Sequence, residues 1–154
     1  MPSIPCTVVP LTQGHYSAVE AVWEASVRST HAFLREDDLL TIKRRLVSDF
    51  LPAVTLSGVF MEGSLAGFSG TASRKLEMLF IAPYWQGRGL GRRLVESAMR
   101  LEGVALVDVN EQNPRALAFY RHMGFEVVGR SERDGMGMPY PLLHMMLRHE
   151  HDQK

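Results

Sequence analysis

Three alternating glycines, Gly87, Gly89 and Gly91, form the chemically most suggestive feature of this 154-residue chain. They follow a dense apolar run at residues 76–81 and open an amphipathic segment at residues 90–101. The first N–H groups of a helix have no partner inside the helix, and the helix dipole adds partial positive charge there. Glycine also lets the backbone approach a pyrophosphate that a Cβ atom would keep away. The pattern predicts a strand, a turn and a helix start that hold a phosphorylated cofactor.

The spacing of the glycines narrows the choice of cofactor. A Walker loop ends in Gly-Lys-Ser/Thr, and the chain has no such ending. A dinucleotide fingerprint needs G-x-G-x-x-G and an acidic residue about 20 positions further on, whereas the glycines here run G-x-G-x-G. Asp108 lies near that distance, but residues 109–125 have no counterpart in the dinucleotide motif. Both phosphate-binding motifs are therefore disfavoured.

A second segment, residues 113–125, carries clear signals for the start and end of a helix. Asn113 is a good N-cap, Pro114 suits the first helical position, and Gly124 supplies a left-handed residue after the last turn. Tyr120 lies one turn before the helix end, on the side expected to face the sheet. A phenol there can bury its ring and leave its hydroxyl in a cleft, although many such aromatic residues merely pack in a core.

Together the two segments resemble the GCN5-related N-acetyltransferase (GNAT) family. The resemblance covers roughly residues 76–126 and follows the family's order. It implies one α/β (α+β) domain over residues 1–154, with a mixed, mostly antiparallel sheet of about seven strands and about four helices. The sheet would be splayed at the cofactor site. The signature Q/R-x-x-G-x-G/A matches Gln86, Gly89 and Gly91, and asparagine followed by A-x-x-F-Y-x-x-x-G-F matches Asn113, Ala116, Phe119, Tyr120, Gly124 and Phe125.

The resemblance implies acetyl-CoA as the cofactor and transfer of its acetyl group to a primary amine. Tyr120 matches the family position for the general acid that protonates the coenzyme A thiolate. Backbone N–H groups near Leu79 would polarise the thioester carbonyl and stabilise the oxyanion. The arginines of the site could also be solvated charges, and its two asparagines a strand-end and a capping residue. The implied cofactor-binding residues are Leu79, Phe80, Ile81, Gln86, Gly87, Arg88, Gly89, Leu90, Gly91, Arg92, Asn110, Asn113 and Tyr120.

The acceptor amine needs a base, because an ammonium of pKa about 10.4 is not a nucleophile. Glu77 is the first candidate, since it is the only charge within residues 76–81. A simpler interpretation makes Glu77 a strand-end residue that pairs with Arg74 or Lys75. His31 is the second candidate, although a loop histidine is more often just solvated or hydrogen-bonded.

Two further segments, residues 23–34 and 139–143, resemble a subgroup of small bacterial GNAT proteins and would flank the acceptor end of the cleft. A small metabolite and a peptide or protein amine both stay open as acceptors, because acceptor pockets diverge within a shared fold. A non-catalytic sensor that binds acetyl-CoA or coenzyme A is the alternative class, and the presence of Tyr120 argues against it. The candidate substrate-binding residues are Trp23, His31, Phe33, Tyr140 and His144.

The composition is that of an ordinary globular domain. Seventeen Lys and Arg residues balance seventeen Asp and Glu residues, so no global field favours nucleic acid or a membrane surface. The single cysteine, Cys6, excludes an internal disulfide, and the histidines lack metal-ligand spacing. No signal peptide or apolar run of about 18 residues is apparent. We expect a cytoplasmic monomer or homodimer with no metal, nucleic-acid partner or membrane partner.

Apolar periodicity predicts the elements that position these residues. Pro52 should end the second helix. Residues 62–64 should form a hairpin turn, and residues 1–5 and 149–154 should be frayed tails. Helices are expected at residues 15–29, 37–50, 90–101 and 114–123, and strands at residues 7–11, 54–61, 65–73, 76–81, 104–109, 125–131 and 142–147.

Overall fold

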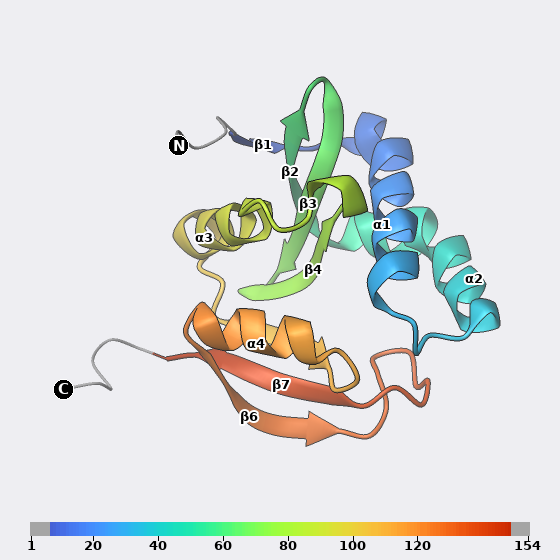
Figure 1. Cartoon of the computed structure of the whole chain (residues 1–154), viewed down its shortest axis with the longest axis vertical. Helices are drawn as coiled ribbons and strands as arrows, with labels where there is room; N and C mark the ends of the chain where they lie inside the picture. Colours follow the sequence, from blue (N-terminus) through green and yellow to red (C-terminus); the bar gives the residue numbers. More distant parts are fainter. Residues whose placement is uncertain (1–6, 149–154) are drawn as a thin grey trace.

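The computed structural model describes residues 7–148, whose elements follow the expected order (Figure 1). The expected tails and Cys6 lie outside the described residues. The α-helices are α1 (Tyr16–Thr30), α2 (Glu36–Arg45), α3 (Leu90–Glu102) and α4 (Pro114–His122). The strands are β1 (Val8–Pro10), β2 (Thr55–Met61), β3 (Ser64–Ala72), β4 (Lys75–Ile81), β5 (Leu106–Asn110), β6 (Phe125–Ser131) and β7 (Leu142–Leu147).

The strands form one sheet in the order β1-β2-β3-β4-β5-β7-β6. All neighbours are antiparallel except β4 and β5, which run parallel. These two strands pair only through Lys75 with Leu106 and Leu76 with Val107. Beyond Leu76 they separate, so the remainder of β4 has no strand on that side. The predicted mixed, mostly antiparallel and splayed sheet is therefore confirmed.

A β-bulge in β4 lies where the strands begin to separate. Gly70 of β3 pairs with Met78, but the next residue, Thr71, pairs with Leu76, so Glu77 is the extra residue on β4. A bulge bends its strand and increases the local twist. The bulge therefore contributes to the divergence of β4 from β5.

Helices cover both faces of the sheet (Figure 1). On one face α1 and α2 pack in a core cluster with Phe68 and Phe80. On the other face α3 packs over Ile81, and α4 packs over β5 and β7. Because side chains alternate along a strand, the end of β4 sends Phe80 to the α1 side and Leu79 and Ile81 to the α3 and α4 side. None of the helices in residues 7–148 has the length and apolarity that crossing a bilayer requires.

The helix expected at residues 37–50 changes form near its middle. The regular α-helix ends at Arg45, and a π-helical turn, Leu46–Phe50, and a 3-10 turn, Leu51–Ala53, follow. The N–H of Leu51 bonds to the carbonyl of Leu46, five residues earlier. Both leucines are buried in the same core cluster. The wider π-helical turn brings these two side chains, five positions apart, to the same face of the segment, which accounts for its presence.

Candidate active site

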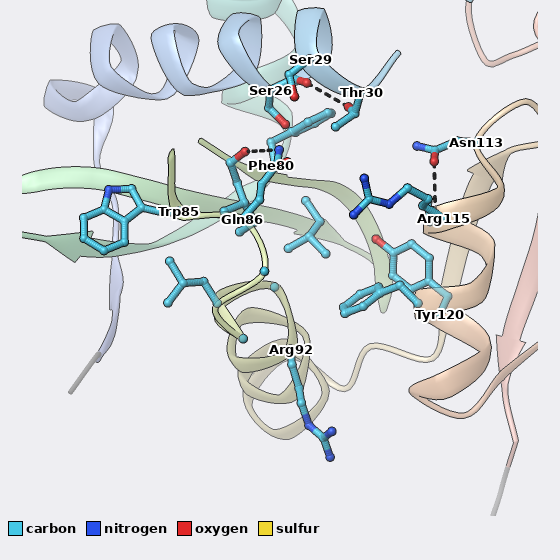
Figure 2. A pocket seen from close by; sticks show the side chains of 18 of the residues that line it. Ser26, Ser29, Thr30, Phe80, Trp85, Gln86, Arg92, Asn113, Arg115 and Tyr120 are labelled. Atoms are coloured by element: carbon cyan, nitrogen blue, oxygen red, sulfur yellow. Dashed lines mark hydrogen bonds between the residues drawn. The ribbon is translucent and has the colours of Figure 1, made fainter. Parts of the chain in front are cut away.

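A cavity of about 620 Å³ lies at the gap between β4 and β5. Figure 2 shows α1 on one side of this cavity and α3 and α4 on the other, with the end of β4 between them. The lining residues are Ser26, Ser29, Thr30, His31, Leu79, Phe80, Ile81, Trp85, Gln86, Gly87, Gly89, Leu90, Gly91, Arg92, Asn113, Arg115, Ala116, Phe119 and Tyr120. Because residues from both faces of the sheet line the cavity, it suits a site where two substrates meet.

The end of β4 presents main-chain groups to this cavity. Just after β4, the N–H of Ala82 donates to the carbonyl of Ala66 on β3 at 2.8 Å. Along an antiparallel pair of strands, hydrogen-bonded residue pairs alternate with pairs that are not hydrogen-bonded. Leu79 and Ile81 fall at the non-bonded positions, so their N–H and C=O groups point away from β3 and into the gap. The Ile81 carbonyl accepts a hydrogen bond from Gln86 Nε2 at 3.1 Å. The N–H of Leu79 is thus a donor directed at the cavity.

The turn between β4 and α3 has a backbone shape that favours glycine. Gly87 and Gly89 have φ values of +77° and +84°, and a Cβ atom at either position would meet no protein atom within 4 Å. Gly89 is the N-cap of α3 and has no side chain to satisfy the first N–H groups of the helix. Gly91 has another role, because a Cβ there would lie 3.6 Å from the Phe119 ring on α4. The turn therefore leaves an open space beside unpartnered helix N–H groups, which fits an anion such as a pyrophosphate.

Helix α4 brings a protected phenol to the cavity. The Asn113 side chain accepts the N–H of Ala116 at 3.1 Å, which confirms the predicted N-cap. Tyr120 is only 7% exposed, yet it lines the cavity, and Figure 2 shows its hydroxyl directed inward beside Arg115. Its ring makes an edge contact with Phe125 at 5.8 Å between centroids. Burial raises the pKa of the Tyr120 hydroxyl far above its usual range, so the phenol keeps its proton at neutral pH.

The end of α1 lines the opposite side of the cavity with polar groups. The Thr30 hydroxyl lies 2.9 Å from the Ser26 carbonyl and 2.7 Å from His31 Nδ1. The His31 ring lies 5.2 Å from the ring of Phe33 and 6.3 Å from that of Phe80. Burial lowers the pKa of His31 below its ordinary value of 6.5, so the imidazole is neutral at neutral pH.

The arginines near the site have different surroundings. The Arg88 guanidinium stacks over the Trp85 ring at 4.8 Å and does not line the cavity. Arg92 lines the cavity, but its Nε donates to Glu96 at 3.1 Å and its side chain points away in Figure 2. Arg115, on the first turn of α4, points inward in the same view. It is the guanidinium best placed to meet an anionic group in the cavity.

The structure brings together most of the residues predicted to bind the cofactor. Those that line the cavity are Leu79, Phe80, Ile81, Gln86, Gly87, Gly89, Leu90, Gly91, Arg92, Asn113 and Tyr120, with His31 from the predicted acceptor group. Those outside the lining are Glu77, Arg88, Asn110, Trp23, Phe33, Tyr140 and His144. The roles of all these residues stay predictions.

Three of the predicted residues outside the lining have other environments. Glu77 is exposed at the bulge of β4. Trp23 is 4% exposed and packs in the core between α1, α2 and the sheet. Asn110 ends β5, and its Oδ1 is buried with no hydrogen-bond partner among the described residues. Burial within the core accounts for Trp23 without an acceptor role.

Tyr140 connects the loop before β7 to the start of α2. Its hydroxyl donates to a carboxylate oxygen of Asp38 and accepts the N–H of Arg35 at 3.1 Å. Its ring lies 6.1 Å from that of Phe33, in an edge contact. The loop before β7 is thereby joined to the start of α2. Phe33 in turn contacts His31, so this predicted pair supports the cavity wall from behind.

His144 belongs to a polar network on the sheet face opposite α4. Its Nδ1 lies 2.7 Å from Asp108 Oδ1 and its Nε2 lies 2.6 Å from Ser131 Oγ, while Lys75 Nζ lies 2.5 Å from Asp108 Oδ2. Burial alone would raise the pKa of Asp108, but the hydrogen bonds from Lys75 and His144 together lower it. The network joins the four strands β4 to β7 across the separation between β4 and β5.

Sequence reasoning did not name several lining residues individually as site residues, although residues 23–34 were expected to flank the cleft and Ala116 and Phe119 match the family signature. On α1 a readable signal existed: positions 26, 29 and 30 are spaced to share one helix face, and all three are small and polar. Arg115 gave a weaker signal, as a cation in the first turn of a well-capped helix, where the helix dipole does not favour it. The lining residues not named individually are Ser26, Ser29, Thr30, Trp85, Arg115, Ala116 and Phe119.

Comparisons with known proteins agree with this geometry. The family model of the acetyltransferase (GNAT) domain matches residues 56–127. The peptidyl-lysine N-acetyltransferase YjaB of Salmonella typhimurium strain LT2 is 42% identical over 127 residues, which cover 82% of this chain and 87% of that protein. The solution structure of apo-form YjaB from Escherichia coli superimposes with a TM-score of 0.83 at 35% identity, over 93% of this chain and 97% of that one. The PaiA N-acetyltransferase of Thermoplasma acidophilum, crystallised with coenzyme A, shares the fold with a TM-score of 0.70 at 20% identity, over 92% and 98% of the two chains.

Proposed function

Because the chain belongs to the GCN5-related N-acetyltransferase (GNAT) family, we propose that it transfers the acetyl group of acetyl-CoA to the side-chain amine of a lysine in a peptide or protein. Family membership makes the chain an N-acetyltransferase and makes acetyl-CoA its cofactor. One observation carries the proposal: a single cavity spans the gap in the sheet and joins a glycine turn, a buried phenol and the polar end of α1. The name of the Salmonella relative supports a peptide lysine as the acceptor.

The turn between β4 and α3 suits the phosphates of the cofactor. The N–H groups at the start of α3 hold the pyrophosphate, and Gly87 and Gly89 leave the space that it occupies. Arg115 adds a positive charge on the facing helix. When bound, acetyl-CoA supplies the acetyl group as a thioester that an amine can attack. The Leu79 N–H then donates to the thioester oxygen, where negative charge develops in the reaction.

Tyr120 acts as the general acid in this proposal. Its hydroxyl faces the cavity, and burial raises the pKa of the phenol, so a proton is available at neutral pH. The phenol would give this proton to the departing sulfur, which would then leave as a neutral thiol instead of a thiolate. Glu77 stays the first sequence-based candidate for the base, but its exposure at the bulge and its position outside the lining do not support that role.

Calorimetry combined with a free-thiol assay tests the proposal. Acetyl-CoA should bind the parent protein, and peptides with one internal lysine should then give thiol release and a mass gain of one acetyl group. The same peptides with lysine replaced by arginine are the control and should give neither signal. Acetyl-CoA binding without thiol release across peptides, polyamines and amino acids would instead support the sensor. Release with small amines alone would contradict a peptide acceptor.

A further inference from the structure

His31 and Tyr120 line the same cavity from opposite faces of the sheet. The His31 ring lies 6.3 Å from Phe80, which packs in the core cluster of α1 and α2. Tyr120 packs in the other core, with Leu79 and the strands under α4. The cavity connects the two faces of the sheet through the gap between β4 and β5. One face can therefore deliver the amine to the reacting carbon while the other receives the departing sulfur.

Hydrogen bonds at the end of α1 define the tautomer of His31. The Thr30 hydroxyl has a single proton and two close partners, the Ser26 carbonyl at 2.9 Å and His31 Nδ1 at 2.7 Å. A carbonyl can only accept, so the hydroxyl proton goes to Ser26. The hydroxyl oxygen must then accept from Nδ1, which therefore carries the ring proton. The lone pair of the neutral imidazole is left on Nε2.

The cavity offers no better proton acceptor than this imidazole. Its lining within the described residues contains no aspartate or glutamate. The lining also holds Arg92, Arg115 and Tyr120. A guanidinium has only donors and no acceptor, and burial raises the pKa of the Tyr120 phenol, so none of these groups accepts the proton. Burial between Phe33 and Phe80 lowers the pKa of His31, which keeps the ring neutral and able to accept a proton.

We propose that His31 is the general base of acetyl transfer and that Thr30 is a positioning residue that holds the Nε2 lone pair available. This inference rests on the proposed function. Nε2 takes one proton from the lysine ammonium, and the new C–N bond forms as the thioester C–S bond breaks. Tyr120 protonates the sulfur, the remaining excess proton on the amine nitrogen restores the phenol, and His31 releases its proton to solvent. The products are one amide, one free thiol and one proton.

Nitrogen NMR of the protein without acetyl-CoA tests the tautomer independently of turnover. In ¹⁵N-histidine-labelled parent protein above the pKa of His31, Nδ1 should be the protonated nitrogen. Thr30→Val should shift the ring towards the Nε2-protonated form, and Thr30→Ser should restore the parent pattern. Thr41→Val is the matched control, because Thr41 makes the same hydroxyl bond to a carbonyl four residues earlier, in α2 and outside the cavity lining. A parent ring protonated on Nε2 would overturn the role of Thr30.

Kinetics with a lysine peptide test the base itself. His31→Gln should lower kcat/KM by roughly 100-fold or more, within the usual range for loss of a general base. Thr30→Val should lower it about tenfold, since only part of the imidazole population then has the productive tautomer. Acetyl-CoA affinity should stay near that of the parent in both variants. His122→Gln, which changes an exposed histidine on α4 outside the lining, is the matched control and should keep the parent rate.

The pH profile separates a base from a merely structural residue. The kcat/KM of the parent should level off above the pKa of His31, because neutral His31 deprotonates the bound ammonium. In His31→Gln it should keep rising towards the amine pKa of about 10.4, because only free amine reacts. Parent-like kinetics in His31→Gln, with the large loss in Glu77→Gln, would overturn this inference and leave the proposed function intact. A parent protein that binds acetyl-CoA and acetylates nothing would overturn both.

Discussion

At the residue scale, the environment of Tyr120 suits a proton donor. A phenol in water is a weak acid, and burial in a shared core with Phe125 raises its pKa further. The group is thus protonated throughout the pH range in which an enzyme of this type works. Its hydroxyl still faces the cavity, where it can donate a hydrogen bond to a departing thiolate. The burial that contributes to core packing therefore also keeps the Tyr120 hydroxyl protonated at the site.

Tyr120→Phe should lower kcat by roughly 100-fold, because the variant keeps the ring and its packing but loses the acidic proton. The dissociation constant for acetyl-CoA should change little, since no phosphate contact is removed. Thiol release measures the first quantity and calorimetry the second. Tyr84→Phe removes a hydroxyl from a 71% exposed tyrosine outside the lining and should behave as the parent. Parent-like turnover of Tyr120→Phe at every pH would exclude a general-acid role.

Residues governed by local rules could be assigned from the sequence alone. Asn113 caps α4 through a bond within its own turn, which composition and spacing predict well. The surroundings of Thr30 and Arg115 depend on what lies across the cavity, and no local pattern encodes this. The bond from Tyr140 to Asp38 is an extreme case, since 102 residues separate its partners in the chain.

At the element scale, the turn before α3 couples backbone conformation to anion binding. Its left-handed glycines turn the chain sharply, so that the first N–H groups of α3 open onto the cavity instead of being capped by a side chain. A residue with a Cβ atom at Gly89 would be strained by about 1–2 kcal/mol in this conformation. It would also project into the space that a phosphate needs. These two effects are separable by experiment.

Gly89→Ala should weaken acetyl-CoA binding at least tenfold, or about 1.4 kcal/mol, on top of its cost to folding. Gly63→Ala is the matched control, because Gly63 has a φ of +81° and a Cβ added there would likewise meet no atom within 4 Å, but it lies in the turn between β2 and β3. Both variants should lose about 1–2 kcal/mol in urea unfolding, and only Gly89→Ala should lose affinity in calorimetry. Equal affinities in the two variants would contradict a phosphate site at this turn.

Element boundaries followed from apolar periodicity, but departures from regular geometry did not. Leu46 and Leu51 continue an apolar pattern that an α-helix also satisfies, so the π turn between them was not apparent. Glu77 is instructive in the same way. A charge inside an apolar strand suggested catalysis, yet at a bulge the extra residue can turn to solvent, which accommodates the charge without a function.

At the scale of the whole molecule, the cavity lies in a sheet that is held together while it is partly open. Only two residue pairs join β4 to β5. The polar network of Lys75, Asp108, His144 and Ser131 lies beside those pairs and connects strands from both halves. We therefore expect the network to stabilise the base of the gap in which the cavity lies.

The architecture of the sheet could be predicted only in part from the sequence. The number of strands and the splayed, mixed sheet followed from the periodicity and from the family resemblance. The position of β7 between β5 and β6 and the bonds from His144 to Asp108 and Ser131 arise from pairing between distant segments. Spacing along the chain does not determine such pairing, because each strand is compatible with several neighbours.

Asp108→Asn should destabilise the fold by about 1–3 kcal/mol at pH 7, because it leaves the half-buried Lys75 ammonium without its counter-charge. The hydrogen bonds of Lys75 and His144 outweigh burial and hold the pKa of Asp108 below its ordinary value of 3.8. A carboxyl whose pKa is lowered by folding stabilises the native state above its unfolded pKa, and this stabilisation is lost as the pH falls through the folded pKa. The advantage of the parent over Asp108→Asn should therefore begin to shrink below about pH 4 and keep shrinking as the pH falls further.

Urea unfolding of parent and variant at pH 7, 5 and 3 measures this difference. Glu126→Gln is the control, because it breaks the more exposed ion pair between Glu126 of β6 and Arg148, which should contribute at most about 1 kcal/mol. If the network secures the base of the gap, Asp108→Asn should also weaken acetyl-CoA binding, whereas Glu126→Gln should not. A loss that is the same at pH 7 and pH 3 would show that the Asp108 charge is not what stabilises the junction. A loss no larger than that of Glu126→Gln would show that two strand pairs and the helices hold the splayed sheet without it.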